Sequence, residues 1–292
     1  MVLSAQSQYV STEIRQDGVA IISYNRPQVA NALNVDVMKE LFDAYTRVLA
    51  DDKVRVLVQT GKGSFFSAGT FPSDPSRARG DVANVDNPSW HQGMDLSGQR
   101  PAHADVDPPA LLHAVNKMLI DCDKVTIAAV NGPGVGYGTS SLGLFDLVYA
   151  VPDAYFFTPF VKWGLAAEAC SSFTFTHALG RQKAAHLILT GERMTAQELE
   201  SAGLISKIFP AENFLETVLA IAQRVAKLPP ISSKANKSLM TSYFKDQLHR
   251  ANDLERELFA KLAAGSETKE AVKKFAKEQR AKKARSAKRE HL

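Results

Sequence analysis

The chain of 292 residues contains only two cysteines, Cys122 and Cys170. Two cysteines are too few for a framework of disulfide bonds, and their scarcity favours a reducing compartment. The opening segment, "MVLSAQSQYVSTEIRQDG", lacks a basic stretch followed by an apolar block, so we expect no secretory signal. No uninterrupted apolar run approaches the ~20 residues that cross a bilayer. These absences predict a soluble intracellular protein without a membrane span.

A strong charge of either sign is also lacking over most of the chain. The formal net charge is +4, and hydrophobic residues make up 45% of the sequence, enough to bury a sizeable core. From Glu267 onward ten basic residues face four acidic ones, so the rest of the chain is slightly acidic. The body therefore has no character of a polyanion-binding protein, whereas the basic tail has.

Hydrophobic patterning predicts an α/β protein. Apolar residues at near-helical spacing over 37–48 predict a helix, with Asn34 or Asp36 available as its cap. From about Cys170 onward the pattern is helical, and Thr195–Glu198 has the spacing of a capping box. Mixed elements followed by helices alone predict an α/β core with a helical extension. Short β-branched segments predict strands at 19–24, 54–60, 124–130, 145–150 and 154–158.

A long segment before the third predicted strand differs in composition. Residues 72–109 are rich in Pro, Gly, Asp and Ser, and Trp90 and Met94 are among their few large apolar residues. We expect a mobile insertion that orders over a ligand. The predicted organisation is therefore a core over 1–205, which includes the insertion, and a helical C-terminal region with a basic tail over 206–292.

The glycine-rich segment "NGPGVGYG" at 131–138 fits three common glycine motifs poorly. A P-loop needs a lysine after its last glycine, but Gly138 is followed directly by Thr139. The same Thr139 stands where a dinucleotide fingerprint requires its third glycine. A nucleophile elbow at Ser140 would need glycine at the position of Leu142.

Glycines after a strand can also expose backbone N–H groups to a developing negative charge. A second such segment, "GKGSFFSAGT" at 61–70, follows the predicted strand at 54–60. The two turns could each aim one N–H at a single oxygen, and such a donor typically contributes ~10²–10³ in rate. Purely structural turns are the alternative.

Three segments resemble the signature segments of the crotonase (enoyl-CoA hydratase/isomerase) superfamily. They are "NRPQVANALN", "GKGSFFSAGT" and "AVNGPGVGYGTSSLGLFDLVYA". "LTGERMTAQELESAGLISKIFP" resembles the segment that follows them, and the resemblance covers roughly residues 10–265. It implies an α/β fold with a crotonase-like ββα spiral core, and a helical C-terminal region that assembles homotrimers or dimers of trimers.

The resemblance also implies an acyl-CoA substrate whose thioester oxygen lies between two backbone N–H groups. By position these belong to Ala68 and Tyr137. Coenzyme A is part of that substrate, so no separate cofactor is expected, and the seven histidines show no spacing that suggests a metal. The residues expected to line the substrate site are Ala30, Phe66, Ser67, Ala68, Gly69, Thr70 and Tyr137.

The acidic residues decide which reaction the resemblance implies. Hydratases of the superfamily resemble one another in having two glutamates, whose positions here are Ser140 and Phe160, so hydration is not expected. Glu168 stands where the Δ3,Δ2-enoyl-CoA isomerase branch, and its peroxisomal type above all, has its one catalytic glutamate. Ala169 replaces the usual glycine beside it. A purely structural reading, in which Glu168 faces water at a helix start, is the alternative.

A single base within reach of C2 and C4 suffices to move the double bond. The small and apolar neighbours of Glu168 should desolvate its carboxyl and raise its pKa. The intermediate would be a dienolate, held by the amides of Ala68 and Tyr137. We therefore predict a Δ3,Δ2-enoyl-CoA isomerase of fatty-acid β-oxidation with Glu168 as the catalytic base.

Other functions stay open. Dienoyl-CoA isomerisation usually needs further acids in the pocket, and Asp74, Asp81, Asp86 and Asp95 of the insertion are candidates; thioester hydrolysis is another alternative. The basic tail could instead bind RNA, as some relatives of the superfamily do. The last residues, "EHL", partly resemble a peroxisomal address read by an import receptor; otherwise we expect a cytoplasmic protein.

Overall fold

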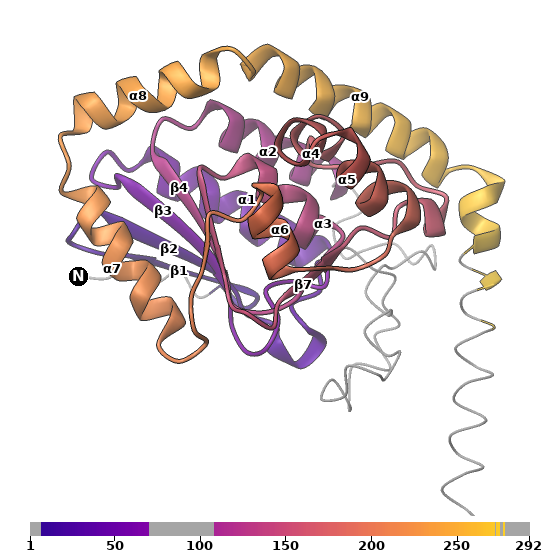
Figure 1. Ribbon diagram of the computed structural model, residues 1–292, viewed down its shortest axis with the longest axis horizontal. Coiled ribbons are helices and arrows are strands. Elements are labelled where there is room, and N and C mark those ends of the chain that lie inside the picture. The colour runs from indigo at the N-terminus through magenta and orange to yellow at the C-terminus, as the bar shows by residue number, and fades with distance from the viewer. Residues whose placement is uncertain (1–6, 70–107, 272, 275–276, 278–292) are drawn as a thin grey trace, which may run out of the picture.

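The computed structural model describes residues 7–69, 108–271, 273–274 and 277 (Figure 1). The predicted insertion at 72–109 lies outside these ranges except for Pro108 and Pro109, which open a helix. Within the described ranges, no helix is both long and apolar enough to cross a membrane.

The centre of the molecule is a six-stranded sheet in the order β1-β2-β3-β4-β6-β9. β1 pairs with β2 antiparallel, and the other neighbours pair parallel. All six residues of β2 are buried, as expected for a strand whose sheet is covered on both faces. The strands are β1 (Val10–Ile14), β2 (Val19–Tyr24), β3 (Val56–Gly61), β4 (Val125–Val130), β6 (Leu147–Ala150) and β9 (Lys207–Ile208).

A second, three-stranded sheet lies beside the carboxyl ends of the central strands. Its order is β5-β7-β8, and the bridge between Ser67 and Gly134 connects it to the segment after β3. The strands are β5 (Gly134–Val135), β7 (Tyr155–Phe157) and β8 (Met194–Thr195).

Helices cover the central sheet on both faces. α1 packs against β1 and β2, and α7 packs across β2, β3 and β4. Asn34 is the N-cap of α1, because its side chain accepts the Val37 N–H at 3.0 Å. The predicted capping box of Thr195 and Glu198 is confirmed at the start of α6. These helices are α1 (Val35–Ala50), α2 (Pro108–Asp121), α3 (Tyr137–Ser140), α4 (Ser171–Leu179), α5 (Arg181–Ala185), α6 (Ala196–Ala202) and α7 (Phe214–Ala226).

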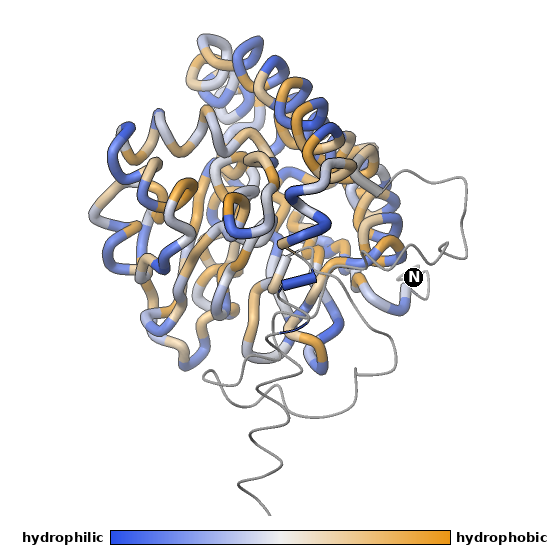
Figure 2. The backbone as a smooth tube through the Cα atoms, turned by 90° about the vertical axis from the view of Figure 1, so that its right-hand side faces the viewer, coloured by the Kyte–Doolittle hydropathy of each residue, from blue (hydrophilic) through white to orange (hydrophobic). Residues whose placement is uncertain are grey.

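Two late helices, α8 (Pro230–Ser242) and α9 (Lys245–Ala263), run along one side of the molecule (Figure 1). α9 packs against α2 and α4, so a late segment of the chain covers earlier ones. Hydrophilic and hydrophobic residues alternate along the helices, as amphipathic helices require (Figure 2). Short 3-10 or π turns are η1 (Pro27–Val29), η4 (Ser141–Leu144), η5 (Val161–Trp163) and η6 (His186–Thr190).

The prediction of helices alone after Cys170 is wrong in two places. β8 joins the small sheet by pairing with β7, and β9 joins the edge of the central sheet by pairing with β6. Each is only two residues long, too short to show a strand pattern. The central sheet and the helix α7 that packs on it therefore extend beyond residue 205.

Candidate active site

The two glycine-bearing turns lie side by side. β3 and β4 are parallel neighbours, so the segments that follow them leave the same edge of the sheet. The Val135 N–H donates to the Ser67 carbonyl oxygen at 2.9 Å, and Ser67 forms a bridge with Gly134. The structure thus brings together the two segments in which the sequence places amide donors.

Glycine is required where the two turns touch. Gly69 has φ = 71°, and a Cβ there would lie 2.3 Å from the Val135 oxygen and 3.0 Å from the Tyr137 nitrogen. A Cβ on Gly138 would lie 2.6 Å from the Ser67 oxygen. A side chain at either position would separate the turns, so these glycines bring Tyr137 N beside the 61–69 segment.

The Tyr137 amide is available as a donor. Tyr137 is the first residue of α3, and its N–H makes no hydrogen bond to the residues that the structure describes. The Ala68 N–H, by contrast, donates to the Ala30 carbonyl oxygen at 2.9 Å. The prediction that Ala68 contributes a free N–H is therefore corrected: that amide already has a partner.

Neighbouring amides of the 66–69 segment are also engaged. The N–H groups of Phe66 and Ser67 both donate to the Pro133 carbonyl oxygen, at 3.2 and 3.4 Å. The Gly69 N–H donates to the Ser67 hydroxyl at 3.1 Å. Thr70, the last predicted residue of this segment, lies outside the described residues. Tyr137 is thus the predicted donor that the described structure leaves unengaged.

The residues predicted to line the substrate site fall into two groups. Ala30, with φ = 53°, joins Ala68 and Val135 in a small apolar cluster next to the two turns. The Phe66 side chain instead belongs to the main core, where its ring packs edge-on against Tyr24 at 5.7 Å. Phe66 can therefore line a ligand only with its backbone.

Glu168 lies in the turn between η5 and α4. Its carbonyl oxygen accepts the Ser171 N–H at 3.1 Å and the Ser171 hydroxyl at 2.7 Å. The next two residues, Ala169 and Cys170, have φ = 56° and 59°. Both are in the left-handed region that favours glycine, which explains why the resemblance leads one to expect glycine at position 169.

The carboxyl of Glu168 has a pKa far above its ordinary value. The residue is only partly exposed, and its carboxyl makes no hydrogen bond to the described residues. Burial, together with the nearby charge of Glu255, raises the pKa of Glu168 from 4.5 to about 8. The direction agrees with the desolvation predicted from its neighbours, whereas the contribution of Glu255 was not predicted.

Glu168 and Tyr137 belong to the same site. The pKa of the Tyr137 phenol is raised well above 10, first by burial and also by the charges of neighbours that include Glu168. The Tyr137 hydroxyl donates to the Asn116 side-chain oxygen at 2.8 Å, and the Asn116 amide donates to the Asn252 oxygen at 2.9 Å. The structure therefore places the predicted base near the residue that carries the free amide.

Three residues of this site were missed in the sequence: Asn116, Asn252 and Glu255. All three are buried polar side chains on helices. Ala251, Asn252 and Glu255 share the inward face of α9, where an amphipathic helix ordinarily has apolar residues. Their presence on that face is the sequence signal, because buried polar groups require partners.

The two positions that carry glutamates in hydratases hold no acid. Ser140 is fully buried, and its hydroxyl has no hydrogen-bond partner in the described structure. Phe160 is buried as well. The other carboxyl that acts on Glu168 electrostatically is Glu255, whose two oxygens already accept hydrogen bonds from Cys170 and Ser172.

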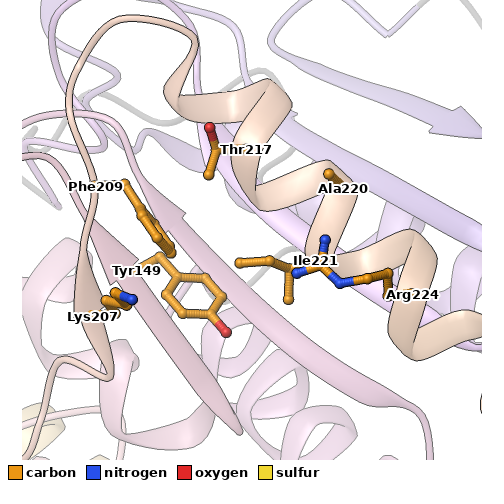
Figure 3. A pocket seen from close by; sticks show the side chains of 7 residues that line it. All are labelled: Tyr149, Lys207, Phe209, Thr217, Ala220, Ile221 and Arg224. Atoms are coloured by element: carbon orange, nitrogen blue, oxygen red, sulfur yellow. The ribbon is translucent and has the colours of Figure 1, made fainter.

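A pocket of about 520 Å³ lies elsewhere, between β6, β9 and α7 (Figure 3). Its lining includes Tyr149, Phe209, Lys207 and Arg224, and no acidic residue. It shares no residue with the Glu168 site and lacks a carboxylate base, so it is not a candidate for proton transfer from carbon.

Comparisons with known proteins identify the family of the chain. The model of the enoyl-CoA hydratase/isomerase family matches residues 14–78 and 92–284. The chain is 35% identical to enoyl-CoA delta isomerase 2 of Rattus norvegicus over 82% of its length. It is 30% identical to enoyl-CoA delta isomerase 3, peroxisomal, of Mus musculus, over 81% of this chain and 68% of that protein.

The chain spans 56% of the rat protein, just over half its length. Among solved structures, an enoyl-CoA hydratase/isomerase from Pseudoalteromonas atlantica is similar, with a TM-score of 0.76 and 30% identity. That similarity covers 93% of this chain and 98% of the other. The chain therefore belongs to the enoyl-CoA hydratase/isomerase family, and its fold is the crotonase fold predicted from its signature segments.

Proposed function

We propose that the chain is a Δ3,Δ2-enoyl-CoA isomerase that converts 3-enoyl-CoA to trans-2-enoyl-CoA in fatty-acid β-oxidation. The observation that carries this proposal is the carboxyl of Glu168, which accepts no hydrogen bond from the described residues, has a raised pKa and interacts electrostatically with Tyr137, the residue whose amide is free. The delta isomerases among its relatives support the same reaction.

The reaction needs one base that works twice. The Glu168 carboxylate removes a proton from C2, and the electron pair of that C–H bond moves into the conjugated system ending at the thioester oxygen. The resulting dienolate takes the same proton from the Glu168 carboxylic acid at C4. The double bond then lies between C2 and C3, and no atom is gained or lost. A pKa of about 8 suits a group that must both take and return a proton near neutral pH.

The developing oxyanion needs donors that are already oriented. In this proposal the N–H of Tyr137 donates to the thioester oxygen, and such a donor typically contributes ~10²–10³ in rate. The hydrogen bond from the Tyr137 phenol to Asn116 anchors the residue without using its amide. Ala68 supports the site differently, by tying its segment to Ala30 through a backbone bond.

Hydration is disfavoured, although the family includes hydratases. It would need a second acid to position and activate water, and Ser140 and Phe160 do not supply one. Dienoyl-CoA isomerisation would draw on Asp74, Asp81, Asp86 or Asp95, which lie outside the described residues. A substrate panel of 3-enoyl-, 2-enoyl-, dienoyl- and saturated acyl-CoA thioesters separates isomerisation, hydration, dienoyl-CoA isomerisation and thioester hydrolysis.

The decisive experiment compares the parent with Glu168→Gln on 3-enoyl-CoA substrates of several chain lengths. Loss of the base should lower kcat by about 10²–10⁴-fold while the thioester still binds. Glu212→Gln, an exposed acid between β9 and α7, is the matched control and should act like the parent. A Glu168→Gln protein as fast as the parent would refute the proposal.

We also propose that the chain assembles as a homotrimer or a dimer of trimers through its C-terminal helices. α8 and the residue after it carry exposed apolar side chains, among them Ile231 at 84% and Tyr243 at 75% exposure. Such side chains are normally covered in an assembly. A peroxisomal location, with an import receptor as partner, is proposed because a mouse relative is a peroxisomal enoyl-CoA delta isomerase. The basic tail and any RNA binding fall largely outside the described residues.

A further inference from the structure

We propose that Glu255, on α9, is a positioning residue that fixes the turn carrying Glu168 and sets the charge beside it. The inference rests on the proposed function, because it concerns the base of that reaction. Glu255 acts through Glu168 and the backbone of its turn.

The contacts of Glu255 are made to the backbone on both sides of Ser171. One carboxylate oxygen accepts the Cys170 N–H at 2.6 Å, and the other accepts the Ser172 N–H at 2.8 Å. These groups lie at the start of α4, where backbone N–H groups lack partners within the helix. Glu255 is only 5% exposed, and it satisfies the buried N–H of Cys170 and the part-buried N–H of Ser172.

The turn needs such a restraint. Ala169 and Cys170 are consecutive non-glycine residues in the left-handed region, and such backbone persists only where its surroundings hold it. The first N–H that donates to Glu255 belongs to Cys170, directly after Ala169. The Ser171 N–H donates to the Glu168 carbonyl oxygen and so completes the turn. Fixing the backbone on the carboxyl-terminal side of Glu168 limits the directions in which its side chain can point.

Of the two neighbouring acids, Glu255 and Glu168, Glu255 is the one that stays ionised. Burial raises its pKa, while the hydrogen bonds from Ser172 and Cys170 act in the opposite direction and stabilise the carboxylate. The N-terminal end of α4 also favours an anion. Glu168 has no such bonds, so it keeps its proton to a higher pH than Glu255 does. The resulting negative charge adds to burial in raising the pKa of Glu168 to about 8.

Few other described groups titrate near Glu168. The Tyr137 phenol, from α3, interacts with it electrostatically and stays neutral because burial raises its pKa. The Cys170 thiol, on the same turn, has a pKa raised by burial first and by Glu255 next, so it is also neutral. Asp253 of α9 acts on Cys170. Glu255 is therefore the described charge whose removal should change the proton affinity of Glu168.

α9 reaches the other half of the site as well. Asn252 lies three residues before Glu255, and its side-chain oxygen accepts the Asn116 amide that supports Tyr137. One helix thus fixes both the base and the residue that holds the oxyanion.

The test is the pH dependence of kcat/KM for the parent, Glu255→Gln, Glu255→Asp and the control Glu257→Gln. Glu257 is an exposed acid on the same helix. In Glu255→Gln the midpoint of the rising limb should move to lower pH by about one unit. Glu255→Asp keeps the charge and should restore the midpoint toward that of the parent, and Glu257→Gln should leave it unchanged. An unmoved midpoint in Glu255→Gln overturns the inference.

A titration that needs no turnover separates this inference from the proposed function. In parent protein labelled with ¹³C at the glutamate carboxyl, the Glu168 resonance is the one absent from Glu168→Gln, and the Glu255 resonance is the one absent from Glu255→Asp. Glu255 should titrate at lower pH than Glu168, whether or not the protein isomerises 3-enoyl-CoA. The opposite order overturns the inference, and this result stands even if Glu255→Gln fails to fold.

Discussion

Two carboxyl groups meet at the start of α4, and they differ in what surrounds them. Glu255 accepts two backbone N–H bonds, whereas the carboxyl of Glu168 makes none to the described residues. Burial disfavours the charge of both. The comparison teaches that hydrogen bonding decides which of two buried acids serves as a fixed anion and which can exchange a proton.

The largest difference is expected in stability. Glu255→Ala leaves the buried Cys170 N–H without a partner and should lower the free energy of unfolding by about 1.5–3 kcal/mol for that charged bond, with a smaller loss from the part-buried Ser172 N–H. Glu168→Ala removes a carboxyl without such bonds, whose ionisation the folded state disfavours, so at pH 7 it should raise rather than lower the free energy of unfolding. Urea unfolding of both variants measures the contrast, and equal losses would contradict it.

The next effect is on the rate. A base with a pKa of about 8 is mostly protonated at lower pH, so kcat/KM should rise with pH and level off above pH 8. At pH 6 it should be roughly a hundredfold below the plateau. A profile that is flat between pH 6 and pH 8 would show that Glu168 is not the titrating base.

Glu168 should also make stability depend on pH. Its folded-state pKa is raised to about 8 from 4.5, so the folded protein binds more protons than the unfolded chain between these values, and stability falls as pH rises. From pH 6 to pH 8 the parent should lose about 2 kcal/mol relative to Glu168→Gln. Unfolding curves of both proteins at the two pH values test this, and parallel behaviour would contradict it.

The smallest effect concerns the residue between the two acids. Ala169→Gly relieves a left-handed backbone but adds freedom to the unfolded chain, so the protein should gain at most about 1 kcal/mol. The pKa of Glu168 should not change, because neither burial nor Glu255 is altered. A clear loss of stability would show that the Ala169 methyl packs better than its conformation costs.

Local patterns predicted much of the fold. The strands β2, β3 and β4 lie within a residue or two of their predicted bounds. Buried parallel strands are continuous apolar runs between turn residues, so their sequences mark them clearly. Asn34 and the Thr195 capping box follow from chemistry within one turn of helix. The meeting of the two glycine turns was inferred from glycines that follow two strands, whereas the identity of the amide donors and the importance of Glu168 came from the resemblance to the crotonase superfamily, whose signature segments are local as well.

Features that depend on distant partners were not predictable. The engagement of the Ala68 amide depends on Ala30, which belongs to another segment. The role of Glu255 depends on α9 packing against α4, and an acid in an amphipathic helix ordinarily faces water. α2 was missed for another reason: its start was included in the Pro-rich insertion, although Leu112, Val115 and Leu119 recur at helical spacing.

The position of α9 in the chain has a consequence for biosynthesis. A ribosome that has translated residue 244 has already made Glu168 and Tyr137, but not the helix that contains Asn252 and Glu255. Because synthesis proceeds from the N-terminus, the nascent polypeptide holds both reacting groups before the last helix arrives to order them. Maturation of the catalytic centre is therefore a late event, and premature termination before α9 should yield a chain that retains both groups but lacks the support of Glu255 and Asn252.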